Sequence, residues 1–154
     1  MLISALLFLG ACDADEPDCC FNMDVGVDMM VSSEDGTDLL NPDNPGAFLE
    51  KDISLYYLVD GESERYFRSH LDASRGFTIY RNESLDAYVI SIFPNTAESE
   101  AYPITYIEWS ETDTDTLRCE FERTKNSLLG TQVWFNGQLK RGPSIAERVF
   151  EVIK

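Results

Sequence analysis

Residues 21–32 read Phe-Asn-Met-Asp-Val-Gly-Val-Asp-Met-Met-Val-Ser, and this stretch decides the fold class. Its apolar side chains alternate with mostly polar ones, so that one side of an extended chain carries Phe21, Met23, Val25, Val27, Met29 and Val31. A period of two residues is typical of a half-buried β-strand. The stretch therefore predicts a strand whose apolar side faces a core.

Further short strands are expected along the rest of the chain, separated by turn signals. Asp60-Gly61 and Asn136-Gly137 are pairs that favour tight hairpins. We expect strands over residues 53–59, 65–71, 77–80, 87–93, 104–110, 116–123, 131–135 and 138–141, with 38–46 as an ordered loop and 111–115 as an acidic hairpin tip. The tail 143–153 suits a helix with a capping box or a closing strand, and its β-branched residues favour the strand.

This series of short strands, without a long helical pattern or an internal repeat, predicts an all-β fold. We expect a two-sheet sandwich of immunoglobulin-like architecture, with a small antiparallel barrel as the alternative. A chain of 154 residues falls within the range of one domain, and 44% hydrophobic residues supply material for one core. Residues 21–154 are therefore predicted to form a single β-sandwich domain.

Acidic residues dominate the charge. The chain has 28 Asp and Glu against 12 Lys and Arg, which gives a formal net charge of -16. Such a field repels phosphate backbones, so nucleic acid is not an expected partner. It would repel anionic lipid head groups as well, so a basic patch is not expected to hold the protein on a membrane.

The N-terminal residues resemble an export signal. Met1–Phe8 form an uncharged apolar run, and Leu9-Gly10-Ala11-Cys12 resembles the lipobox at which bacterial lipoprotein signal peptides are cut. The resemblance implies a signal peptide over residues 1–11 and a Cys12 that becomes the lipidated N-terminus, held in the membrane by its acyl chains. The alternative is an ordinary buried strand or helix followed by a chance cysteine.

Residues 12–20 are then read as the lipidated cysteine and an acidic tether. The acidic residues directly after Cys12 resemble the export signal that sends lipoproteins of Bacteroidota to the outer face of the outer membrane. In enterobacterial sorting, an Asp at the position of Asp13 instead favours the inner membrane. The order of features, with Asp38-Leu39-Leu40-Asn41-Pro42 before Asp52-Ile53, then Asn136-Gly137 and a terminal Val-Ile-Lys, resembles small uncharacterised lipoproteins of Bacteroidota. The resemblance implies a surface-exposed cell-envelope location at the outer membrane. It does not indicate any particular activity.

Three cysteines remain besides Cys12, and an odd number cannot all pair within the chain. Adjacent Cys19 and Cys20 would form a strained ring, and both Cys19 and Cys119 share the parity of inward-facing neighbours. A disulfide between Cys19 and Cys119 is one interpretation, and three reduced thiols are the other. A zinc site is disfavoured because His70 is the only histidine.

The sequence favours a protein that is not an enzyme and has no cofactor. His70 has no nucleophile motif near it, and no phosphate-binding glycine loop is present. With 28 acids, chance carboxylate pairs are too common to indicate a glycosidase. Asp113 and Asp115 could offer oxygen ligands to calcium, although a solvated hairpin tip is the favoured interpretation.

Trp134 carries the one hint of binding. It shares a strand side with Gln132, opposite Val133 and Phe135, and an exposed indole can stack on a sugar ring or anchor a protein, although packing is favoured. Tyr56 has similar parity and is a second candidate. We expect a lipid-anchored, non-catalytic cell-envelope sandwich that binds a glycan or a protein. The alternatives are a small envelope hydrolase with paired carboxylates and a structural accessory subunit of an outer-membrane assembly.

Overall fold

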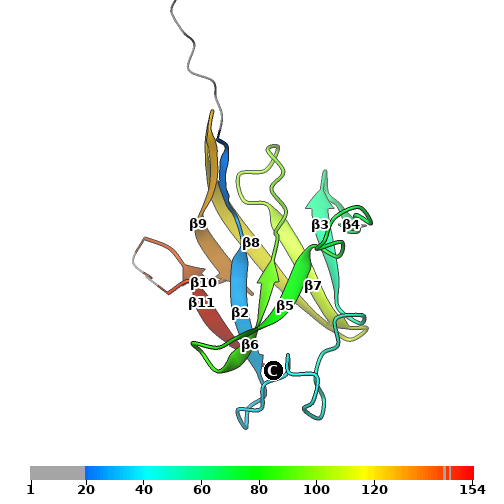
Figure 1. Ribbon diagram of the computed structural model, residues 1–154. Coiled ribbons are helices and arrows are strands. Elements are labelled where there is room, and N and C mark those ends of the chain that lie inside the picture. The colour runs from blue at the N-terminus through cyan, green and yellow to red at the C-terminus, as the bar shows by residue number, and fades with distance from the viewer. Residues whose placement is uncertain (1–19, 144, 146) are drawn as a thin grey trace, which may run out of the picture.

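The computed structural model describes residues 20–143, 145 and 147–154, and two packed β-sheets account for their arrangement (Figure 1). Within this part of the chain one sheet has seven strands, the other has four, and neither closes on itself. The predicted all-β sandwich is therefore confirmed, and the alternative of a small barrel is wrong.

The large sheet contains β1 (Asn22–Asp24), β3 (Ser54–Val59), β4 (Glu62–Arg65), β7 (Ile104–Ser110), β8 (Asp113–Thr124), β9 (Ser127–Phe135) and β10 (Gln138–Arg141). Its order is β1-β9-β8-β7-β3-β4, and β10 also pairs with β9. The small sheet contains β2 (Val27–Ser32), β5 (Phe77–Asn82), β6 (Ala87–Ile92) and β11 (Val149–Ile153), in the order β11-β2-β6-β5. β1 runs parallel to β9, and β11 runs parallel to β2.

The core fills the space between the two sheets. The strands that line it contribute alternate side chains, because successive residues of a strand point to opposite faces. The buried residues of the cluster include Val27, Met29 and Val31 from β2, Ile90 and Ile92 from β6, Leu55 from β3, Ile107 and Trp109 from β7, Leu117 and Cys119 from β8, and Val133 and Phe135 from β9. The predicted core position of Trp109 is confirmed, at 1% exposure.

The stretch that predicts the fold forms two strands rather than one. β1 lies on the large sheet and β2 on the small sheet, so the chain crosses the edge of the sandwich at Val25 and Gly26. Val25 is buried at the crossing, whereas Phe21 and Met23 are 57% and 61% exposed. The prediction that Phe21 and Met23 face the core is therefore wrong, because alternation gives the side of a strand but not the sheet to which it pairs.

Turn geometry explains a second correction. Asp60 and Gly61 have φ values of 50° and 82°, the left-handed pair that a tight two-residue hairpin requires, and Val59 pairs with Glu62. The return strand is therefore β4, which ends at Arg65, and residues 66–71 are not the strand predicted for them. The Asn136-Gly137 hairpin is confirmed, with φ values of 48° and 80°.

The β7–β8 and β8–β9 hairpins are longer than predicted. β8 begins at Asp113 and β9 at Ser127, so most of the predicted acidic tip is strand. Gly130 lies inside β9 at a register shift, where an added Cβ would stand 2.6 Å from Arg141 Nη2. The absence of a side chain at Gly130 leaves room for the Arg141 guanidinium beside the backbone. The tail strand is confirmed as β11.

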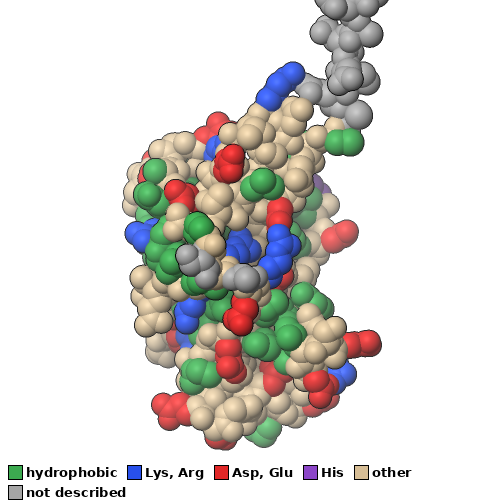
Figure 2. All heavy atoms as spheres, turned by 90° about the vertical axis from the view of Figure 1, so that its left-hand side faces the viewer, with side chains coloured by type: hydrophobic (Ala, Val, Ile, Leu, Met, Phe, Trp, Pro, Cys, Tyr) green, Lys and Arg blue, Asp and Glu red, His purple; other side chains and the backbone are tan. Residues whose placement is uncertain are grey.

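The loops gather at two ends of the sandwich (Figure 1). The chain enters at Cys20 beside the β8–β9 hairpin, and we call this the N-terminal end. The loop over 33–52 lies at the opposite, distal end. Acidic side chains are spread over the face drawn in Figure 2, with basic and hydrophobic ones between them. No helix among the described residues has the length and apolar character needed to cross a bilayer.

Candidate functional site

The solvent-facing side of the large sheet carries a cluster of two rings and a guanidinium, which we call the Trp134 cluster. Trp134 on β9 pairs with Arg118 on β8. The Arg118 guanidinium carbon lies 4.4 Å from the centroid of the Trp134 ring and 5.5 Å from that of Tyr102. The two rings meet edge to face, with their centroids 5.7 Å apart. Arg118 is therefore stacked against both aromatic residues.

The cluster is partly buried and partly open to solvent. Trp134 is half-buried, while its neighbours Val133 and Phe135 lie in the core, and Tyr102 is 48% exposed. Arg118 Nε is buried and has no hydrogen-bond partner among the described residues. Contact between a guanidinium and aromatic faces favours this arrangement. Trp134 thus lies outside the core, and its ring packs against Arg118 and Tyr102.

The same outer face continues across the sheet toward β3. Tyr56 on β3 pairs with Tyr106 on β7, and Tyr106 pairs with Thr116 on β8, one row away from Arg118. Trp134 and Tyr56 therefore share a face, but they are three strands apart, which is roughly 14 Å at the usual strand spacing. The structure brings the two predicted binding residues to one surface without bringing them into contact.

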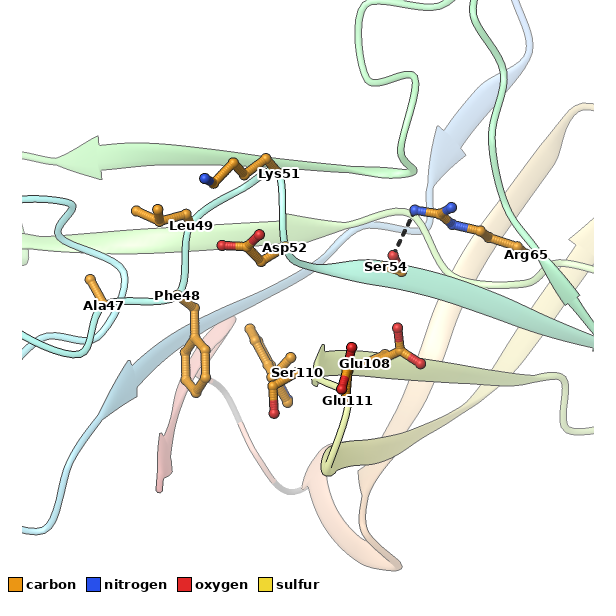
Figure 3. Close-up of a pocket in the computed structure, with 11 residues that line it drawn as sticks. Ala47, Phe48, Leu49, Lys51, Asp52, Ser54, Arg65, Glu108, Ser110 and Glu111 are labelled. Atoms are coloured by element: carbon orange, nitrogen blue, oxygen red, sulfur yellow. Dashed lines mark hydrogen bonds between the residues drawn. The ribbon is translucent and has the colours of Figure 1, made fainter.

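A polar pocket at the distal end adjoins this face, and we call it the distal pocket (Figure 3). Its volume is about 560 Å³. Tyr56 links the two parts of the surface, because its hydroxyl donates a hydrogen bond of 3.5 Å to Oε1 of Glu108 on the pocket wall. Arg65 Nη2 donates a 2.9 Å hydrogen bond to Ser54 Oγ on the same wall. The outer face and the distal pocket thus form one continuous surface.

The walls of the distal pocket offer both aromatic and polar groups. The Phe48 and Trp109 rings lie 5.2 Å apart and tilted by 38°. Asp52 comes from the segment before β3, whereas Glu108 and Glu111 come from the end of β7 and the turn after it (Figure 3). Asp52 and Glu111 are exposed to solvent. Their carboxylates can therefore accept hydrogen bonds from a ligand in the pocket.

The calcium candidates Asp113 and Asp115 are joined by the ammonium of Lys154. Lys154 Nζ lies 2.6 Å from Asp113 Oδ1 and 2.5 Å from Asp115 Oδ2. Asp115 also accepts hydrogen bonds of 2.7 Å from Trp109 Nε1 and from Asn136 Nδ2. The ammonium takes the position between the carboxylates that the hypothesis gave to a metal ion. The described residues hold no group of three or more ligands suited to a metal.

The cysteine predictions fall mostly outside the described residues. Cys12 and Cys19 both lie there, so lipidation and the pairing of Cys19 with Cys119 stay predictions. Cys119 is 1% exposed with a free thiol, and burial raises its pKa to about 12.

Sequence reasoning missed Tyr102 and Arg118. Tyr102 lies in the loop before β7, where no periodicity applies. The outward parity of Arg118 could have been read from buried Leu117 and Cys119, but its pairing with Trp134 depends on the bulge between Glu120 and Phe121. His70 is exposed.

Comparisons with known proteins add no relationship to this geometry. No family model matches the chain, no curated protein matches it, and no solved structure matches it.

Proposed function

We propose that this protein is a lipid-anchored, non-catalytic protein of the cell envelope that binds a glycan through the outer face of its large sheet. The observation that carries the proposal is the Trp134 cluster, which lies on the same continuous surface as the distal pocket. Fixed aromatic rings beside charged and hydroxyl groups suit a ligand with apolar faces and polar edges.

A sugar has this mixed character. Its C–H faces can pack on Tyr102 and Trp134. Further sugar units of the same chain can reach the distal pocket, where their hydroxyl groups can exchange hydrogen bonds with the side chains of Arg65, Glu108 and Ser54. The net charge of -16 disfavours polyanionic glycans. The proposed ligand is therefore a neutral glycan.

The lipid anchor rests on Leu9-Gly10-Ala11-Cys12 and its likeness to a lipobox. The direction in which the chain enters supports this arrangement. The described chain begins at the N-terminal end, and the loop over 33–52, which supplies part of the lining of the distal pocket, lies at the opposite end (Figure 1). An anchor at Cys12 would leave the distal pocket turned away from the membrane.

The test is binding of soluble neutral polysaccharides, namely a glucan, a mannan, a galactan and a xylan, with polygalacturonate as the polyanionic comparison. Binding is measured by affinity gel electrophoresis and calorimetry. We expect at least one neutral polymer to bind and polygalacturonate not to bind. Trp134→Ala and Tyr102→Ala should each weaken binding at least tenfold. Tyr80→Ala, which removes a 41% exposed ring from the other sheet, should leave binding unchanged.

Two results would contradict the proposal. One is that none of the neutral polymers binds. The other is that binding survives Trp134→Ala with the affinity of the wild type. The melting temperature of each variant separates a loss of binding from a loss of folding.

A second candidate function is hydrolysis of the same glycan, favoured by Asp52, Glu108 and Glu111 around one pocket. Glycoside hydrolases use a pair of carboxyl groups on either side of the scissile bond. The check is release of reducing ends from the four neutral polymers. Release that is abolished by Asp52→Asn or Glu111→Gln, with binding retained, would establish the enzyme and refute the non-catalytic role.

A further inference from the structure

An apolar groove opens at the N-terminal end of the sandwich. Its volume is about 450 Å³, and most of its lining is apolar or aromatic: Met23, Val25, Tyr57, Tyr66, Leu71, Ala73, Phe93 and Pro94, with Asp72 and Thr96. The groove has a firm floor, because the Tyr57 and Tyr66 ring centroids lie 4.7 Å apart and the Tyr57 hydroxyl donates a 2.6 Å hydrogen bond to the Phe93 carbonyl oxygen.

Large apolar side chains stand exposed around this groove. Met23, Leu71 and Phe93 on its walls are 61%, 45% and 42% exposed. Phe21 and Phe67, each within two residues of a lining residue, are 57% and 54% exposed. Large exposed apolar patches on a soluble domain mark surfaces that meet a protein, a membrane or a ligand.

The charged groups beside the groove suit a lipid surface. Asp72 is the one acidic residue among its lining residues. The Arg68 guanidinium lies 5.2 Å from the Tyr66 centroid, and Arg123 Nη2 donates a 2.7 Å hydrogen bond to the Thr96 carbonyl oxygen. Arg123 also lies 4.0 Å from Glu98. Guanidinium groups at the edge of an apolar surface can reach lipid phosphates while their stems stay in apolar contact.

The chain itself brings this groove close to the proposed anchor. Met23 and Val25 line the groove, and the described chain begins at Cys20, eight residues after Cys12. Eight residues span at most roughly 29 Å when fully extended. A lipid on Cys12 would therefore keep the groove within reach of the leaflet, and the groove is at the end that faces it.

We propose that this groove docks on the lipid leaflet that holds the anchor, with Phe93, Leu71 and Met23 entering the boundary between head groups and acyl chains. The inference rests on the lipid anchor of the proposed function and adds a fixed orientation to it. Docking at the N-terminal end holds the distal pocket away from the membrane.

The test uses the full chain, purified from bacterial membranes and reconstituted in phosphatidylcholine vesicles with or without brominated phosphatidylcholine, which quenches tryptophan in the bilayer. Phe93→Trp places the probe in the groove. Leu85→Trp is the matched control, because Leu85 is 44% exposed and lies beyond the opposite end of β6. The emission of wild-type protein, from Trp109 and Trp134, is subtracted.

We expect brominated lipid to remove at least half of the added emission of Phe93→Trp and to leave that of Leu85→Trp unchanged. Leu71→Trp is a second groove probe in case Phe93→Trp fails to fold. Equal quenching of groove and control probes would overturn the inference. So would an unquenched groove accompanied by dimers on chemical cross-linking, since the occupant would then be a second copy of the chain.

Vesicle flotation and the intact mass of the protein separate this inference from the proposal on which it rests. If Cys12 carries acyl chains and the protein floats while both groove probes stay unquenched, docking is refuted and the anchor stands. If Cys12 carries no lipid and the protein stays with the soluble fraction, the anchor is refuted and docking with it.

Discussion

Replacing Asp115 by alanine should destabilise the fold strongly. Asp115 is a buried acid, with 8% of its side chain exposed, and it accepts hydrogen bonds from Trp109 and Asn136 while pairing with Lys154. Asp115→Ala leaves the buried Trp109 N–H without its acceptor. It also takes from Lys154, whose side chain is 14% exposed, one of its two carboxylates. Hydrogen bonds to a charged group contribute about 1.5–3 kcal/mol each.

The expected loss is about 3–5 kcal/mol in the free energy of unfolding, in line with other buried pairs that lose one partner. For a domain of this size each kcal/mol lowers Tm by about 2–4 °C, so the predicted fall is roughly 6–20 °C. Chemical unfolding and thermal unfolding followed by circular dichroism measure the two quantities. The folded fraction of Asp115→Ala should keep its Trp134 cluster, because that cluster lies on the other face of the large sheet.

Asp113→Ala is the matched control. Asp113 also pairs with Lys154, but its side chain is 36% exposed. The pair between them is worth about 0–1 kcal/mol at such exposure. If Asp115→Ala cost no more than Asp113→Ala, the network around Trp109 would contribute little, and the reasoning from burial would be refuted.

Two further predictions concern other buried positions. Cys119 has a folded pKa of about 12 against an ordinary value of 9.0, so the folded state holds its proton more tightly and the free energy of unfolding should fall as pH rises from about 9 to 12. Cys119→Val should remove that part of the slope in chemical unfolding, and an unchanged slope would contradict this. Gly76→Ala should lower the free energy of unfolding clearly more than Gly36→Ala, for which we expect a loss of about 1 kcal/mol. Both glycines have φ above +80°, but of the two only Gly76 has a neighbour that an added Cβ would meet, at 2.8 Å from Tyr66. Equal losses would show that the crowding at Gly76 is relieved without cost.

Local patterns were enough to predict most strands. The Asn136-Gly137 hairpin and the alternation around Leu117, Cys119 and Val133 are properties of neighbouring residues, and each is confirmed. The crossing at Val25 and Gly26 is different, because the side-chain period continues through it while the pairing partner changes. Pairing between distant strands, such as β1 with β9, carries no local signal.

The candidate site was predictable in part for the same reason. Outward parity singled out Trp134, which lies half-buried outside the core. Arg118 and Tyr102 join it through strand register and a loop, both of which depend on the whole fold. The Lys154 contacts with Asp113 and Asp115 join the last residue of the chain to a strand 39 or more residues away, which no spacing rule could predict.

Nuclear magnetic resonance offers the most direct test that a glycan binds at the Trp134 cluster, because the chain has two tryptophans and thus two indole N–H signals. Trp134 lies in the cluster on the proposed binding surface. Trp109 borders the distal pocket, but it is only 1% exposed and its N–H donates a hydrogen bond to buried Asp115, so a ligand is expected to affect its signal less. On addition of a neutral polysaccharide that binds, the account predicts that the Trp134 signal shifts more than the Trp109 signal and that the shift saturates with the same dissociation constant as calorimetry. Saturating binding that leaves the Trp134 signal in place would contradict it.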